Sequence, residues 1–202
     1  MVGSGWEEHV GSTGYYLPVL LKRRKRWQAN EPILRRLKMV LRRHRPTTVV
    51  DIGAGSGAYV RALRELGHKA WGLDGTPGIE EITAGDVLEQ DLVLDCSAHF
   101  DSANWGIFIE VGEHVPKEFE QTLIDNVCRI PTQGLIVSWN PSKRVGIRHV
   151  NPRTNTYIAC EFGRRDWQVD EAMTRKIRKR GDERISPRFL NTLMVLRKHH
   201  VQ

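Results

Sequence analysis

The sequence predicts an α/β protein whose open, mostly parallel sheet carries helices on both faces, a doubly wound arrangement. Runs rich in β-branched and apolar residues alternate with runs of helical periodicity. The strand-like runs are apolar at consecutive positions, which is typical of strands buried on both faces. The predicted strands comprise residues 47–53, 68–75, 104–111, 134–139 and 191–198, and the predicted helices after the first and third of them comprise residues 58–67 and 116–130.

A basic helix precedes the first strand. Asn30 suits its N-cap and Pro32 its first turn, because both residue types are favoured there. An apolar stripe runs from Ile33 to Leu41, and Pro46 ends the helix. The first 14 residues are rich in Gly and Ser and predict a loosely held end. We therefore expect a basic, helical N-terminal extension over residues 1–45, which could act as a lid or substrate arm, and one α/β domain over 46–202.

The charge and the cysteine content indicate which partners and which cellular compartment to expect. The net charge is +7, and Lys and Arg gather in residues 22–45 and 175–188. Such segments indicate an acidic partner, namely nucleic acid, a phosphate-bearing acceptor or anionic lipid, or else a solvated helix face. Cys96, Cys128 and Cys160 form no CxxC pair, and no apolar run approaches the ~20 residues of a membrane span. A cytoplasmic protein with reduced thiols is expected.

The stretch DIGAGSG, residues 51–57, carries glycines at alternate positions directly after the first predicted strand. Ligands bind at this edge of such sheets, and glycine lets them approach the backbone. A phosphate-binding P-loop is excluded, because no Lys stands at its required position. A dinucleotide fingerprint fits Gly53, Gly55 and Ala58, with Asp74 lying 21 residues after Gly53, so the glycines and spacing leave a nicotinamide cofactor open.

Asp51 favours a different ligand. A carboxylate at the strand end would oppose a pyrophosphate but suits S-adenosylmethionine, which carries an ammonium and a sulfonium and no phosphate. At this point the sequence resembles the class I S-adenosylmethionine-dependent methyltransferases, whose first motif is E/D-x-G-x-G-x-G. Asp51, Gly53, Gly55 and Gly57 match it position by position.

The resemblance continues through WGLDG, AGDVLEQDL and IFIEVGEHVP. It implies a Rossmann-like methyltransferase sheet and S-adenosylmethionine as cofactor, with Asp74 at the ribose hydroxyls and Asp86 and Val87 flanking the adenine. The cofactor-binding residues that it implies are Asp51, Gly53, Ala54, Gly55, Gly57, Asp74, Gly75, Asp86, Val87 and Glu110.

The methyl acceptor is much less defined than the cofactor. Methyl transfer needs alignment of the reactants, and a general base only where the nucleophile must lose a proton early. The catalytic candidates are His114, Glu110 and His149; His114 equally suits a helix cap, and the turn with His149, Asn151 and Asn155 equally suits a surface loop. The acceptor atom is expected to be O or N.

A metal-dependent alternative stays open beside this prediction. Small-RNA 2′-O-methyltransferases carry E-x-x-E-H and a later His that hold a divalent metal, and Glu110, Glu113, His114 and His149 have that pattern. The same letters occur in metal-free quinone-type methyltransferases. The overall motif order also resembles small methyltransferase-like proteins with a PGQGG segment before HVN. Here residues 140–148 replace that segment with two Arg and a Lys, which hints at an anionic acceptor.

We therefore expect a methyltransferase that transfers a methyl group from S-adenosylmethionine to an O or N acceptor. Three alternatives remain from the residues: the metal-dependent RNA enzyme, a binding module with a methyltransferase fold and no catalysis, and a nicotinamide oxidoreductase.

Overall fold

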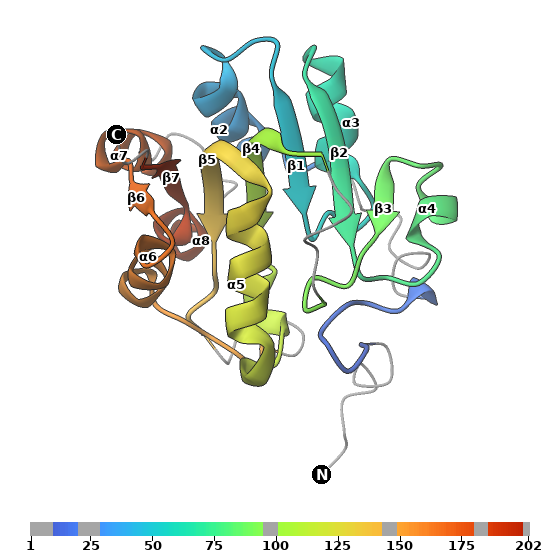
Figure 1. Ribbon diagram of the computed structural model, residues 1–202. Helices are drawn as coiled ribbons and strands as arrows, with labels where there is room; N and C mark the ends of the chain where they lie inside the picture. Colours follow the sequence, from blue (N-terminus) through green and yellow to red (C-terminus); the bar gives the residue numbers. More distant parts are fainter. Residues whose placement is uncertain (1–9, 20–28, 95–100, 143–148, 180–185, 200–202) are drawn as a thin grey trace.

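The computed structural model describes residues 10–19, 29–94, 101–142, 149–179 and 186–199 (Figure 1). Cys96, the basic residues 22–28 and the loop 143–148 lie outside these ranges, while Cys128 and Cys160 are free thiols. No helix among the described residues has the length and apolarity to cross a membrane. The strands are β1 (Thr48–Ile52), β2 (Lys69–Asp74), β3 (Val87–Glu89), β4 (Ala103–Ile109), β5 (Pro131–Ser138), β6 (Trp167–Val169) and β7 (Met194–Lys198). The α-helices are α2 (Glu31–Leu41), α3 (Ala58–Glu65), α4 (Ile79–Ile82), α5 (Glu120–Arg129), α6 (Asn155–Gly163), α7 (Glu171–Arg178) and α8 (Pro187–Thr192), and the 3-10 turns are η2 (Gly112–His114) and η3 (Lys117–Phe119).

The seven strands form one sheet in the order β3-β2-β1-β4-β5-β7-β6. Strands β1 to β5 pair in parallel, and β7 lies antiparallel to both β5 and β6. The predicted doubly wound, mostly parallel sheet is therefore confirmed. Because the parallel strands share one direction, the carboxyl ends of β1, β2, β4 and β5 meet at one edge, the lower edge in Figure 1.

Both faces of the sheet are buried in separate hydrophobic layers. Val49 and Ile107 pack with α2 and α3 on one face, whereas the adjacent Val50 and Phe108 pack with α5 and α6 on the other. Neighbouring residues of a strand point to opposite faces, so each strand needs apolar side chains at consecutive positions. This requirement explains the continuous apolar runs in the sequence.

Helix α2 begins where the sequence predicts. The Asn30 side chain accepts a hydrogen bond from the backbone N–H of Ile33, and Pro32 lies in the first turn. Its apolar stripe belongs to the same core layer as β1, so the helix packs on the sheet. The domain boundary expected after residue 45 stays a prediction. Arg36 is buried and donates to the carbonyl oxygens of Pro32 and Ile177, which ties α2 to α7. The chain then leads from α2 into the start of β1, so the basic end of α2 lies at the amino edge of the sheet (Figure 1).

Several elements escape the sequence pattern. Strands β3 and β6 have three residues each, too short for a periodic signal. Helices α6 and α7 enter between β5 and β7, and the run predicted as a strand from residue 191 first completes α8 at Thr192 before β7 begins at Met194.

Candidate functional site

The turn after β1 brings the backbone close to a cavity at the carboxyl edge of the sheet. Gly53, Gly55 and Gly57 have φ values of 81°, 52° and 72°, in the left-handed region that side chains disfavour. A Cβ on Gly53 would lie 2.4 Å from a methyl group of Val111. Glycine at position 53 is therefore required both by the backbone conformation and by the close approach of Val111.

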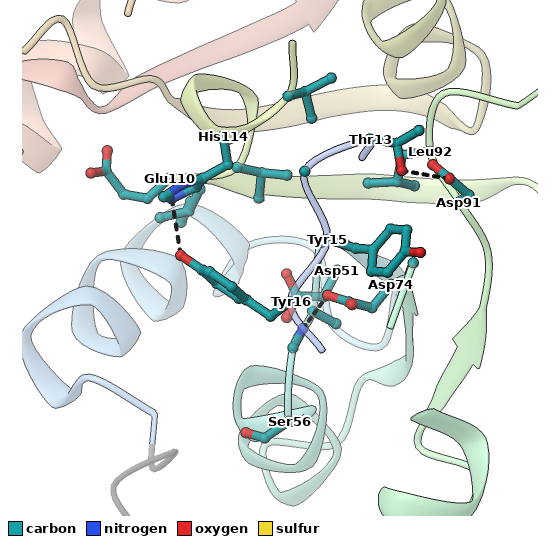
Figure 2. A pocket seen from close by; sticks show the side chains of 18 of the residues that line it. Thr13, Tyr15, Tyr16, Asp51, Ser56, Asp74, Asp91, Leu92, Glu110 and His114 are labelled. Carbon is teal, nitrogen blue, oxygen red and sulfur yellow. Dashed lines mark hydrogen bonds between the residues drawn. The ribbon is translucent and has the colours of Figure 1, made fainter. Parts of the chain in front are cut away.

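Asp74, at the end of β2, is held in place by the same turn. The Gly55 backbone N–H donates to Asp74 Oδ2 at 2.8 Å, and the Thr76 N–H and hydroxyl donate to Oδ1 at 3.0 and 2.7 Å. The carboxylate faces the cavity beside Asp51 (Figure 2). Its orientation is thus fixed before any ligand enters, as acceptors of ligand hydrogen bonds need to be.

Asp51 is a buried carboxylate with an unused oxygen. The residue is 4% exposed, and its Oδ2 has no hydrogen-bond partner among the described residues. Burial, and then the nearby Asp74 carboxylate, raise the pKa of Asp51 to about 7. Both effects disfavour the anion, so a cationic group placed at this oxygen would relieve the cost of ionising Asp51.

The cavity measures about 750 Å³ and is acidic. Four carboxylates line it, those of Asp51, Asp74, Asp91 and Glu110, and the described lining contains no Lys or Arg. The other described lining residues are neutral apart from one histidine. They are Thr13, Gly14, Tyr15, Tyr16, Asn30, Gly53, Ala54, Gly55, Ser56, Ala58, Tyr59, Gly75, Leu92, Val93, Ile109, Val111, His114 and Val115.

The N-terminal segment crosses the mouth of this cavity (Figures 1 and 2). The Thr13 hydroxyl donates to Asp91 Oδ2 at 2.7 Å, and the Tyr16 carbonyl oxygen lies 2.8 Å from the Thr76 hydroxyl oxygen. The Tyr16 hydroxyl lies 3.3 Å from His114 Nε2. Within the stretch expected to be loosely held, Thr13 is joined to Asp91 by a tertiary hydrogen bond that no local pattern reveals, and residues 1–9 lie outside the described residues.

The predicted adenine pair, Asp86 and Val87, does not line the cavity. The Asp86 carboxylate forms ion pairs with Arg61 and Arg64, and Val87 is fully buried at the start of β3. Strand β3 ends at Glu89, so the cavity is reached two residues later, at Asp91 and Leu92. Sequence reasoning missed Asp91 and Leu92, although a firm boundary for β3 would have pointed to them.

Glu110 follows β4 directly and occupies a strained conformation. Its φ of 54° is in the left-handed region, where a non-glycine residue costs about 1 kcal/mol. The Ser138 hydroxyl donates to Glu110 Oε1 at 2.9 Å, and the Asn140 amide donates to Oε2 at 3.1 Å. Both partners come from the end of β5, so the carboxylate is held between β4 and β5 and directed into the cavity.

Three of the four predicted metal ligands gather beside Glu110. Ligand atoms of Glu113, His114 and His149 all lie within 4.8 Å of one another. Glu113 is fully buried, and neither carboxylate oxygen has a hydrogen-bond partner among the described residues. Burial, followed by the Glu110 carboxylate, raises the pKa of Glu113 well above its ordinary range. An unpaired buried carboxyl group beside two imidazoles fits the donor set of a divalent first-row metal.

His149 reaches this group through a buried network that the sequence did not reveal. The Asn151 backbone N–H donates to the Glu113 carbonyl at 3.0 Å, and the Trp139 indole donates to the Asn151 carbonyl at 2.7 Å. The Asn151 amide donates to Glu120 at 2.9 Å. Asn151, expected to orient a substrate, is 2% exposed and instead anchors the loop. The His149 Nδ1 lies 2.8 Å from the Ser142 carbonyl, which leaves Nε2 as the outward nitrogen.

Comparisons with known proteins agree with this architecture. The chain matches no protein-family model, and no curated protein sequence matches it. Among solved structures it resembles N-methyltransferase NodS from Bradyrhizobium japonicum WM9, solved with S-adenosylhomocysteine, at 15% identity over 97% of both chains with a TM-score of 0.64.

Two further solved structures show the same architecture. Magnesium protoporphyrin IX methyltransferase ChlM from Synechocystis PCC 6803 gives a TM-score of 0.62 at 15% identity, over 84% of this chain and 82% of its own. The small RNA methyltransferase HEN1 gives 0.60 at 16% identity, over 85% of this chain and 25% of its own. Strand order, cavity position and these similarities together show that the chain has the Rossmann-like fold of the class I methyltransferases.

Proposed function

We propose that the protein is an S-adenosylmethionine-dependent methyltransferase that acts on an O or N acceptor. The observation that carries the proposal is the acidic cavity with its unpaired Asp51 oxygen. A dinucleotide would place a pyrophosphate among four carboxylates with no Lys or Arg in the described lining, which is electrostatically unfavourable. S-adenosylmethionine presents two cationic groups and no phosphate, so the nicotinamide alternative is disfavoured.

Different residues of the cavity bind different parts of S-adenosylmethionine. Asp51 holds the cofactor's ammonium, Asp74 accepts hydrogen bonds from the ribose hydroxyls, and the turn through Gly53 and Gly55 approaches the ligand by its backbone. Asp91 and Leu92 flank the adenine in place of Asp86 and Val87. When bound, the cofactor supplies a methyl carbon already activated by the sulfonium. Glu110 and His114 orient the acceptor nucleophile, and the N-terminal segment excludes water.

Calorimetric titration tests the cofactor assignment. We expect S-adenosylmethionine and S-adenosylhomocysteine to bind at micromolar Kd and NADH not to bind. Asp51→Asn and Asp74→Asn are each expected to weaken S-adenosylmethionine binding by about tenfold or more, because each removes a charge that faces the ligand. Asp86→Asn is the matched control, since Asp86 pairs with Arg61 and Arg64 away from the cavity. NADH binding without either sulfur ligand would refute the proposal; cofactor binding without methyl transfer to any acceptor would indicate the non-catalytic module.

A second candidate function is metal-dependent 2′-O-methylation of RNA. The convergence of Glu113, His114 and His149 favours it, with Glu110 adjacent. A divalent ion held there would act as a Lewis acid on an acceptor hydroxyl.

Titration of manganese(II), followed by electron paramagnetic resonance, tests the metal site independently of activity. We expect one bound ion, loss of binding in His149→Ala, and unchanged binding in His44→Ala, whose imidazole stacks against Trp105 on the opposite side of the sheet from the carboxyl edge. Equal manganese binding by both variants would remove this candidate function and leave the metal-free methyltransferase.

A further inference from the structure

A second cavity, of about 700 Å³, lies next to the cofactor cavity. Glu110 lines both, so the residue that follows β4 borders the two spaces. The walls of the second cavity come from the end of β5, the start of α6, and α8. Its lining residues are Glu110, Asn140, Pro141, Ser142, Thr154, Asn155, Ser186, Phe189, Asn191 and Thr192.

The chemistry of this lining is neutral and polar. Apart from Glu110, the described lining residues carry no ionisable side chain. Their amides and hydroxyls can each both donate and accept hydrogen bonds, which matches the hydroxyl and amide groups of a ligand. Among the described lining residues Phe189 is the aromatic one, and a flat or pyranose-like ring can pack against it. An anionic group near Glu110 would be repelled, since its carboxylate has no cationic partner among the described lining residues.

Hydrogen bonds connect the segments that form the walls of the second cavity. The Asn155 amide donates to the Asn191 carbonyl at 2.6 Å and so joins α6 to α8. The Ser142 backbone N–H donates to Asn140 Oδ1 at 3.0 Å, while the Asn140 amide holds Glu110. These bonds join α6 to α8 and hold the residues after β5 to Glu110 after β4. A preformed cavity loses less conformational entropy on binding than one that must fold around its ligand.

From this juxtaposition we propose that the second cavity is the acceptor site and that it takes an uncharged ring compound bearing hydroxyl groups, such as a nucleoside or a sugar. The proposal rests on the methyltransferase function proposed above. Glu110 accepts a hydrogen bond from the reacting hydroxyl and aims its oxygen at the cofactor cavity. The oxygen–methyl bond forms as the carbon–sulfur bond of the cofactor breaks, S-adenosylhomocysteine leaves, and the hydroxyl proton passes to solvent. The anionic acceptor expected from residues 140–148 becomes the opposing outcome.

Matched neutral and anionic probes test the chemical class. Uridine and methyl β-glucoside are titrated into the protein saturated with S-adenosylhomocysteine, beside uridine 5′-monophosphate and glucose 6-phosphate. We expect one neutral probe to bind and its phosphorylated counterpart to bind at least about tenfold more weakly. Preference for the phosphorylated probes, or no binding of either neutral probe, would overturn the proposal. Uridine and the glucoside also distinguish a nucleoside from a sugar as the source.

A cavity-filling pair of variants tests the location. Asn191→Trp places a large side chain in the second cavity, whereas Thr156→Trp adds the same side chain on α6 outside its lining. Asn191→Trp is expected to weaken binding of the neutral probe by about tenfold or more and to leave the affinity for S-adenosylhomocysteine within about twofold. Thr156→Trp is expected to change neither affinity. Retained probe binding in Asn191→Trp refutes the location. Failure of the wild-type protein to bind S-adenosylhomocysteine instead refutes the proposed function itself.

Discussion

The two cavities differ in how their walls are built. The cofactor cavity depends on one turn and the neighbouring strand ends, with Asp51, Gly53 and Gly55 only a few residues apart and Asp74 held by that same turn. The second cavity takes its walls from residues 140–142, 154–155 and 186–192, which meet only in the folded protein. The residues with the clearest proposed cofactor contacts are therefore close together in the sequence, although residues 13–16 and 91–93 complete that cavity. The walls of the proposed acceptor cavity meet only through tertiary packing.

The largest effect is expected from a substitution in the turn that lines the cofactor cavity. Gly53→Ala forces a Cβ to within 2.4 Å of Val111 at a φ of 81°. We expect it to lower the free energy of unfolding by about 3 kcal/mol and to abolish cofactor binding. Gly67→Ala is the matched control, because Gly67 has a similar φ of 84° and nothing within 4 Å of the added Cβ. It is expected to cost about 1 kcal/mol in urea denaturation. Equal losses in the two variants would contradict the role given to the Val111 contact.

The next largest effect is expected from the hydrogen-bond network around Glu120, whose members are far apart in the sequence. Glu120 is 3% exposed and accepts hydrogen bonds from Asn151, Arg153 and Tyr157. Glu120→Ala is expected to cost about 2–3 kcal/mol of unfolding free energy, because it leaves buried donors without an acceptor. Glu120→Gln keeps part of the network and should cost less. We also expect Glu120→Ala to leave S-adenosylhomocysteine affinity unchanged, since Glu120 does not line the cofactor cavity; a large loss of affinity would show that this network and the cofactor cavity are coupled.

The same network gives a pH dependence. Burial raises the pKa of Glu120, but hydrogen bonds from Arg153, Tyr157 and Asn151 outweigh it and hold the pKa below its ordinary value. A carboxyl group with a lowered pKa stabilises the folded state above its unfolded pKa and loses that contribution as pH falls. Denaturation curves between about pH 6 and pH 3 should therefore converge for wild type and Glu120→Gln. Parallel curves would refute this role of Glu120.

A smaller effect is expected from Asp51→Asn, which should raise the stability of the apoprotein while it lowers the affinity for the cofactor. Because burial and Asp74 raise the pKa of Asp51 to about 7, ionised Asp51 destabilises the apoprotein. The cost is absent below the unfolded pKa near 4, grows as pH rises and is complete above about pH 7. Asp51→Asn should therefore stabilise the apoprotein at pH 8 by about 1–2 kcal/mol and have little effect on its stability at pH 4. The measurement is thermal denaturation at both pH values; a loss of stability at pH 8 would contradict it.

The binding affinity of the wild-type protein should show the complementary trend. A cationic ligand favours ionised Asp51, so S-adenosylmethionine affinity should rise by up to about tenfold between pH 6 and pH 8. Asp51→Asn should remove most of this rise. A pH-independent affinity in the wild-type protein would place the cationic group of the cofactor away from Asp51.

Particular residues show how far the sequence alone reaches. Asp51 and the three glycines could be predicted from the sequence because they lie within one short stretch. The glycines are needed there for positive φ values and for the close approach of the backbone at a strand end. Asp86 and Val87 were assigned from the resemblance to a motif, whereas the cavity lining contains Asp91 and Leu92, which follow the three-residue strand β3. No local pattern marks Glu120 as buried, because its hydrogen-bond partners Arg153 and Tyr157 lie more than 30 positions away. The N-terminal segment carries no pattern at all, since its place depends on hydrogen bonds to Thr76 and Asp91.

The place of Glu110 in the lining of both cavities has a consequence for inhibitor design. A single compound that joins an adenosyl head to a hydroxylated ring would need linking atoms that pass Glu110, the residue that borders both spaces. Once the first half is bound, the second is already at high effective concentration. Such a bisubstrate ligand should gain about 10²-fold or more over either half alone. Its linker length would then act as a ruler for the separation of methyl donor and acceptor.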